Sequence, residues 1–316
     1  MNRILALVVF ALGCGATAPV ANEPTGNEIA EEATDDAADP RQVDAAAVAR
    51  GAGVEPTVGD DGVVKVTWAR TDVQITVDGS AFPAAAGLTS WAAFTGTATG
   101  AMLMGDTVVF EDEAGAAMDA AFAHGLEVSA IHNHFFFDRP PVYFMHIGGM
   151  GDAEQLAVGV RAVWDAIRAV RAETPQPSDD FGGDAAIAEG TLDASALGDA
   201  LDAEPAVAGG VVKFTWAREG AMHGVRIGGG MGLTTWTAFV GSDGAASVDG
   251  DFIMTAEEVQ PVLRALRQHG FHVVALHNHM IGGEPFFYFT HYWGTGPAIE
   301  LARGLAAVRE AQDIAP

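Results

Sequence analysis

The feature that most constrains the fold of this chain is an internal repeat. Residues 64–70, Val-Lys-Val-Thr-Trp-Ala-Arg, recur at 212–218 with a single replacement, and residues 87–94 recur in similar form at 232–239. Stretches that repeat in the same order predict two homologous domains built from the same elements. The matching copies also resemble a symmetric homodimer joined into one chain.

Changes in composition set the expected boundaries. An apolar N-terminus is followed by a stretch of Ala, Thr, Pro and acidic residues without apolar periodicity, which is typical of a disordered tether. A second stretch rich in Pro and acid separates the two copies. The expected segments are a signal peptide at 1–14, a tether at 15–42, repeat domain 1 at 43–173, a linker at 174–183 and repeat domain 2 at 184–316.

The first segment indicates a bacterial lipoprotein. Arg3 precedes an apolar run that is too short to span a bilayer, as in a secretory signal. The run ends in Ala-Leu-Gly-Cys, which is similar to a lipobox, so Cys14 is the expected site of lipidation. We therefore expect a protein of the bacterial cell envelope, held to a membrane by its N-terminal lipid on the periplasmic or extracellular face. The alternative is an ordinary secretory signal in which Cys14 has no special role.

The balance of charge excludes one class of partner. The chain has 42 acidic side chains against 16 Lys and Arg, and its formal net charge is −26. Because contacts to phosphate need Lys and Arg, we expect no binding to nucleic acid, and the two His-Asn-His strings are not interpreted as a nuclease motif. Cys14 is the only cysteine, so the folded part depends on its core and not on disulfides within the chain.

Periodicity within each copy predicts an α+β fold. In the second copy, residues 211–217 alternate as a strand does, and Thr255 with Glu258 has the form of a capping box at a helix start. His269 and Gly270 are suited to the end of that helix. We expect each copy to run as a short helix, four strands, a helix, two strands and a helix. Such a unit is an antiparallel sheet with helices packed on it.

Histidines dominate the candidate site. His277 and His279 share a face if they lie on a strand, and His291 follows after a Gly-Gly-Glu-Pro turn. In a hairpin centred on Glu284, His277 lies opposite His291 and His279 lies opposite Phe289. Three imidazoles on one face predict a metal site, and zinc and copper are the metals that favour imidazole. The first copy has the same pattern at His132, His134 and His146.

Several neighbouring residues bear on what such a site does. Glu284 is the candidate catalytic base, in a His-x-His pattern followed by an acid that resembles the first motif of cupins, and Asp138 is the nearest acid in the first copy. The alternative for both acids is a turn residue that faces water. Met280 favours copper, because a thioether suits Cu(I). Asp106 and Asp251, each preceded by glycine, are interpreted as turn residues.

A set of motifs in the second copy is specific enough to suggest a family. The helix start at Thr255 and Glu258, Ala-Leu-His-Asn-His-Met at 275–280, Glu-Pro at 284–285 and His-Tyr-Trp-Gly at 291–294 resemble the LppY/LpqO lipoprotein family. The resemblance covers both copies. It implies a bacterial lipoprotein with a repeated domain, and it supplies no reaction, because the domain of that family is one of unknown function.

The first copy departs from this pattern at the turn. Phe135, Phe136 and Phe137 fill it with apolar bulk, and Arg139 stands where the second copy has Glu284. A positive charge at that place opposes a bound dication. We therefore expect the second copy to carry the working site and the first mainly to support it.

These observations leave three functions open. The leading one is an envelope lipoprotein with a three-histidine zinc or copper site in at least one copy. As an enzyme, it would use the metal to activate water or polarise a carbonyl, with Glu284 as the base. The second is a non-enzymatic module that binds metal, a small molecule or a cell-wall ligand. The third is a structural envelope protein whose histidines form a buried hydrogen-bond network. Arg70 and Arg218, which end matching strands, are expected to pair with an acid or bind an anionic ligand.

Overall fold

The computed structural model describes residues 42–182 and 191–313. The predicted signal peptide with Cys14 lies outside these residues, as does the predicted tether apart from its last position. The predicted linker is described through Gly182, and the second repeat from residue 191 onward. No helix in the described ranges is both long enough and apolar enough to cross a membrane.

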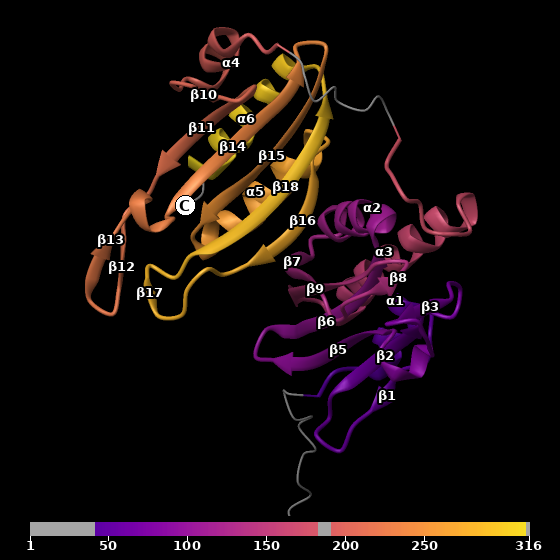
Figure 1. The fold of residues 1–316 in the computed structure, drawn as a ribbon. Helices are drawn as coiled ribbons and strands as arrows, with labels where there is room; N and C mark the ends of the chain where they lie inside the picture. The colour runs from indigo at the N-terminus through magenta and orange to yellow at the C-terminus, as the bar shows by residue number, and fades with distance from the viewer. Residues whose placement is uncertain (1–41, 183–190, 314–316) are drawn as a thin grey trace, which may run out of the picture. The chain divides into compact units, whose positions relative to one another are not determined.

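Both repeats contain the same elements in the same order, which can be followed in Figure 1. Repeat 1 consists of α1 (Ala45–Ala52), β1 (Thr57–Val58), β2 (Val64–Ala69), β3 (Ile75–Val77), β4 (Ser80–Phe82), the 3-10 helix η1 (Ala84–Ala86), β5 (Thr89–Thr97), β6 (Gly100–Phe110), α2 (Glu111–Ala123), β7 (Glu127–Asn133), β8 (Asp138–Arg139), β9 (Val142–Gly151) and α3 (Ala153–Glu173). Repeat 2 consists of α4 (Ala194–Leu201), β10 (Ala206–Ala208), β11 (Val211–Ala217), β12 (Gly220–Met222), β13 (Val225–Ile227), η2 (Gly229–Met231), β14 (Thr234–Ser242), β15 (Ala245–Met254), α5 (Ala256–Gln268), β16 (His272–His277), β17 (Gly283–Glu284), β18 (Tyr288–Gly296) and α6 (Ala298–Asp313).

The predicted α+β class with two homologous antiparallel units is confirmed, but each unit has more strands than expected. The additional strands are two or three residues long, which is too short for an alternating pattern to be visible in the sequence. Three of them form a small separate sheet in each repeat, with the order β4-β3-β8 in repeat 1 and β13-β12-β17 in repeat 2. These small sheets hold the loops that follow the histidine strands.

The long strands of both repeats join in a single sheet. Its order is β1-β2-β5-β6-β9-β7-β16-β18-β15-β14-β11-β10. Each strand of repeat 1 therefore lies as far from its edge of the sheet as the corresponding strand of repeat 2 lies from the opposite edge. At the middle, β7 and β16 run antiparallel, and Ile131 pairs with Leu276. These two residues are counterparts in the repeat. Pairing of a residue with its own counterpart is what a two-fold axis requires, so the repeats meet as an isologous pair.

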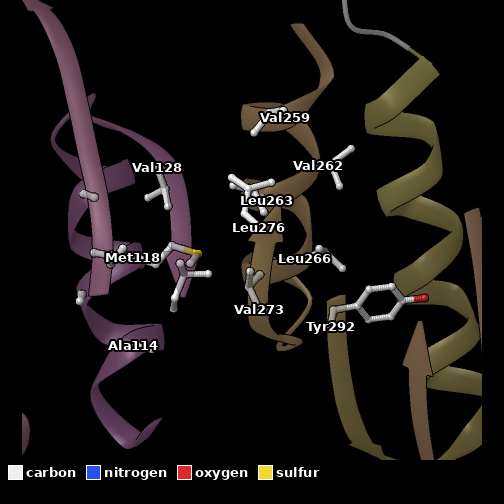
Figure 2. Packing of buried hydrophobic residues seen from close by; sticks show 14 of the residues in the cluster. Ala114, Met118, Val128, Val259, Val262, Leu263, Leu266, Val273, Leu276 and Tyr292 are labelled. Carbon is white, nitrogen blue, oxygen red and sulfur yellow. The ribbon is translucent and has the colours of Figure 1, made fainter. Parts of the chain in front are cut away.

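Helices and polar side chains bridge the two repeats. Apolar residues of both contribute to one core cluster, and Figure 2 shows members from each side, among them Met118, Val128, Leu263 and Leu276. The side chain of Gln260 accepts a hydrogen bond from the backbone N–H of Val128 at 3.1 Å. It also donates a hydrogen bond to the backbone carbonyl of Val128 at 2.8 Å. β7 pairs with β16 only between Ile131 and Leu276, so the peptide group of Val128 is met across the repeat boundary by a side chain.

The two arginines that end the matching strands pair with acids, as predicted. Arg70 is 1% exposed and donates two hydrogen bonds of 2.8 Å to the carboxylate of Glu113, which is fully buried. Glu113 also accepts the backbone N–H of Phe110 at 2.9 Å at the start of α2. In repeat 2, Arg218 and Glu258 make the same ion pair at 2.6 Å, but the arginine side chain is 28% exposed. The pair thus joins a strand to the following helix in both repeats, and it is fully desolvated in only the first.

Candidate metal centre

An aspartate on the central part of β15 belongs to the histidine site. Asp251 pairs with Trp236 of β14 on one side and with His291 of β18 on the other. The interpretation of Asp251 as a turn residue is therefore wrong, and Asp106 of repeat 1 lies within β6 in the same way. The residue before Asp251, Gly250, lies in a strand and does not form a turn. A Cβ at this position would lie only 2.3 Å from the hydroxyl oxygen of Tyr292. Close packing therefore explains that glycine.

The second repeat brings four possible metal ligands together. One ligand atom from each of Asp251, His277, His279 and His291 lies within 4.8 Å of the others. The Nε2 atoms of His277 and His279 are 3.2 Å apart, and Nε2 of His279 is 3.5 Å from Oδ2 of Asp251. Ligand atoms about 2.0–2.1 Å from a tetrahedral zinc are roughly 3.3–3.4 Å from one another. These two separations are therefore close to those of a tetrahedral site.

The hairpin that carries the histidines differs in register from the prediction. His277 pairs with Phe289, and His291 pairs with Ala275, so the strands are displaced by two residues. A shift of two leaves every side chain on its predicted face, whereas a shift of one would reverse it. His279 lies beyond the end of β16, and its ring stacks on Phe289 with centroids 3.5 Å apart. The three imidazoles still converge, because the last of them is held by this stacking and not by strand pairing.

Burial gives the site an unusual electrostatic character. Asp251 is 2% exposed, and its Oδ1 atom has no hydrogen-bond partner. Desolvation raises the pKa of this carboxyl from 3.8 to about 6, against the opposing effect of His291. Burial and the neighbouring imidazoles lower the pKa of His277, and burial with His291 lowers that of His279. The lowered pKa values favour neutral imidazoles, which are the form that binds metal. The ionised Asp251 carboxylate is poorly solvated, so a bound cation would stabilise it.

The first repeat contains the counterparts of these four residues, one aspartate and three histidines, in a less converged arrangement. Asp106 pairs with His146 across β6 and β9, and the Nε2 atoms of His132 and His146 are 2.9 Å apart. His134 stacks on Phe144 at 3.3 Å, as its counterpart does on Phe289. Burial again raises the pKa of Asp106. Among the residues that the structure describes, however, only the set in repeat 2 brings all four ligand atoms together.

Neither of the two acids singled out from the sequence belongs to this four-residue group. Glu284 is exposed and pairs with Ala221 in the small sheet, and it is not a member of the four-residue group. The acid that contacts the histidines is Asp251, through His279. Asp138 is buried and accepts the backbone N–H of Val142 at 2.7 Å, so it fixes the turn. A signal for Asp251 was present in the sequence, because Gly-Asp recurs at the same place in both copies.

The fold and the site define a class: a tandem-repeat α+β protein with a His₃Asp group on the sheet of its second repeat. The chain belongs to the family described as Domain of Unknown Function (DUF1259), whose model matches residues 46–166 and again 195–311. The two matched segments correspond to the two structural repeats. No match is found among curated proteins.

Two solved structures show a distant likeness. One is a trimeric bacterial microcompartment shell protein, PduB, with 13% identity, a TM-score of 0.20, and coverage of 81% of this chain and 89% of that one. The other is EtuB from Clostridium kluyveri, with 10% identity, a TM-score of 0.19, and coverage of 81% and 88%. At these TM-scores the likeness indicates neither a shared fold nor a shared function.

Proposed function

We propose that this protein is a metal-binding lipoprotein of the bacterial cell envelope, and that its second repeat holds a zinc or copper ion. The observation that carries the proposal is the convergence of Asp251, His277, His279 and His291, with ligand atoms within 4.8 Å of one another. Imidazole nitrogens with one carboxylate oxygen are a donor set that suits both metals.

The fourth ligand bears on whether the ion is held or used in catalysis. Catalytic zinc sites keep three protein ligands and leave a position open for water, whereas sites with four protein ligands are closed. Asp251 supplies the fourth donor here, and Glu284, the base expected from the sequence, is exposed and is not a member of this group. These features favour a site that holds its ion over one that activates water.

The envelope location rests on the sequence. The lipobox-like segment ending at Cys14 and the resemblance to LppY/LpqO lipoproteins support a lipid anchor at the N-terminus. The acidic stretch that follows is suited to keep the folded repeats away from a membrane surface.

Replacement of the lipidated residue tests this location. We expect Cys14→Ser to abolish labelling by a radioactive or clickable fatty acid and to move the protein from the membrane fraction to the soluble fraction, because no acyl chain can then be attached. A Cys14→Ser variant that stays in the membrane fraction would contradict the lipid anchor.

Replacement of the buried carboxylate tests the metal site. We expect wild-type protein to bind one equivalent of Zn²⁺ in repeat 2, and Asp251→Asn to bind it at least about tenfold more weakly, because outer partners alone contribute 10–100-fold. Isothermal titration of metal-free protein provides both values. If Asp251→Asn binds Zn²⁺ as tightly as the wild type, Asp251 is not a ligand; if the wild type takes up neither zinc nor copper, the proposed function fails.

The same variant has an expected effect on metal-free stability. The folded state raises the pKa of Asp251 to about 6, so ionising this group above that pH destabilises the folded protein. Asp251→Asn should then be more stable than wild type at pH 7.5, by up to about 3 kcal/mol. The difference should shrink as the pH falls through 6 toward 4, because the wild-type carboxyl then takes up a proton in the folded state and no longer carries a buried charge. Thermal unfolding of both metal-free proteins across this range measures it, and a difference that does not change with pH would contradict the stated cause.

A further inference from the structure

Three methionines lie together on the open face of the sheet in repeat 1. Along β6, Ala101 and Leu103 are buried in the core beneath the helices, while Met102 and Met104 point to the other face and are 37% and 60% exposed. Met150 of β9 is 64% exposed. Exposed apolar side chains are common singly, but a group of three on one face calls for an explanation.

The strand register places these thioethers within reach of one another. Met102 pairs directly with Met150, and Met104 pairs with Gly148. Directly opposed residues have Cβ atoms about 4.5–5.5 Å apart, and diagonal neighbours are roughly 7–8 Å apart. Gly148 has no side chain, so the long and flexible chain of Met104 has free space toward Met150. The three sulfur atoms can therefore converge above the sheet without a change in the backbone.

The second repeat shows that the fold does not require methionine at these places. The positions that correspond to Met102, Met104 and Met150 are Ser247, Asp249 and Thr295, which have the equivalent pairings in β15 and β18. Hydrophilic residues thus serve equally well on the open face of the same sheet. The three methionines are therefore specific to repeat 1, and the fold that the two repeats share does not require them.

We infer that Met102, Met104 and Met150 form a binding site for a soft monovalent metal ion, Cu(I), separate from the His₃Asp site of repeat 2. Thioethers select Cu(I) over the harder divalent ions, and three of them are a donor set that imidazole and carboxylate sites do not offer. Asp106 and His146 lie on the same face of β6 and β9, one pleat further along. The histidine group of repeat 1 therefore borders the thioether site.

A titration with Cu(I) tests the inference. Metal-free full-length protein is titrated anaerobically with Cu(I) in competition with a chromogenic Cu(I) chelator, and Ag(I) serves as a second probe of similar softness. The test variant is Met102→Leu/Met104→Leu/Met150→Leu, which keeps apolar side chains of similar volume and removes the sulfur atoms. We expect it to lose one equivalent of Cu(I), or to bind that equivalent at least about tenfold more weakly.

Two controls separate this site from others. Met231→Leu removes a methionine that is 66% exposed and lies outside the group, and it should leave Cu(I) binding unchanged. His277→Ala/His279→Ala removes the zinc site of repeat 2 and should leave the thioether equivalent in place, so the failure of one site is distinguishable from that of the other. The inference is overturned if the triple leucine variant binds Cu(I) with wild-type stoichiometry and affinity, or if Met231→Leu loses as much as the triple variant.

Discussion

Replacing His277 and His279 together by alanine should weaken metal binding by more than about a hundredfold. The basis for this figure is that the loss of a single outer partner of a metal ligand already costs 10–100-fold in affinity, and this variant removes two ligands. The remaining Asp251 and His291 lie on adjacent strands and hold at most two positions of the ion. Isothermal titration with Zn²⁺ and competition with a chelator of known affinity measure the loss.

The internal repeat supplies the matched control for this variant. His132→Ala/His134→Ala makes the same change in repeat 1, where the four ligand atoms do not converge as in repeat 2. We expect it to leave the tight zinc site unaffected. Equal losses in the two double variants would contradict the assignment of the working site to repeat 2, and no loss in either would remove the metal site altogether.

A second large effect concerns stability. Glu113→Ala should lower the free energy of unfolding by about 3–5 kcal/mol, because it removes a fully buried carboxylate that pairs with both Arg70 and Arg171 and leaves Arg70 only the partly exposed Asp72 as a charge partner. The variant also removes the acceptor for the Phe110 N–H at the start of α2. Urea denaturation followed by circular dichroism measures the change, and Glu113→Gln, which keeps part of the hydrogen bonding, should fall between the variant and the wild type.

Glu258→Ala is the matched change in repeat 2. Glu258 likewise accepts the N–H of the residue at the helix start, Thr255, at 2.7 Å and pairs with Arg218. Because Arg218 is partly exposed, water can replace the lost partner, and we expect a loss on the order of 1–2 kcal/mol. If the two alanine variants lose the same stability, the burial of Arg70 is not what makes its ion pair important.

Local patterns in the sequence were sufficient for the repeated elements and for the histidines. The helix start at Thr255 and Glu258 was predictable because capping depends on residues three apart in the chain. The common face of His277, His279 and His291 was predictable because it depends only on parity along two strands, which a two-residue change of register preserves. Of the two expectations for Arg70, an acid or an anionic ligand, the structure shows the first, and the sequence did not identify Glu113 as the partner.

The remaining features depend on contacts between distant parts of the chain. Asp251 joins the histidines because β15 lies beside β18, and a Gly-Asp dipeptide by itself is more typical of a turn. The register of the hairpin depends on the pairing of β17 with β12, which are too short to be visible as strands in the sequence. The meeting of Ile131 with Leu276 depends on the packing of one whole repeat against the other.

The isologous meeting of the repeats has a consequence for how the chain has diverged since its halves were identical. In such an arrangement, a contact between one residue of the first half and one of the second is matched by a second contact between their counterparts in the opposite halves. Asp119 forms an ion pair with Arg267 at 2.8 Å, and the exchanged contact, between Arg264 and Phe122, is a cation–π interaction at 4.5 Å. Two identical second halves would place Arg264 against Arg267 at both contacts, where like charges repel. Covalent fusion has thus let the two halves become complementary partners, and the second half no longer suits pairing with a copy of itself.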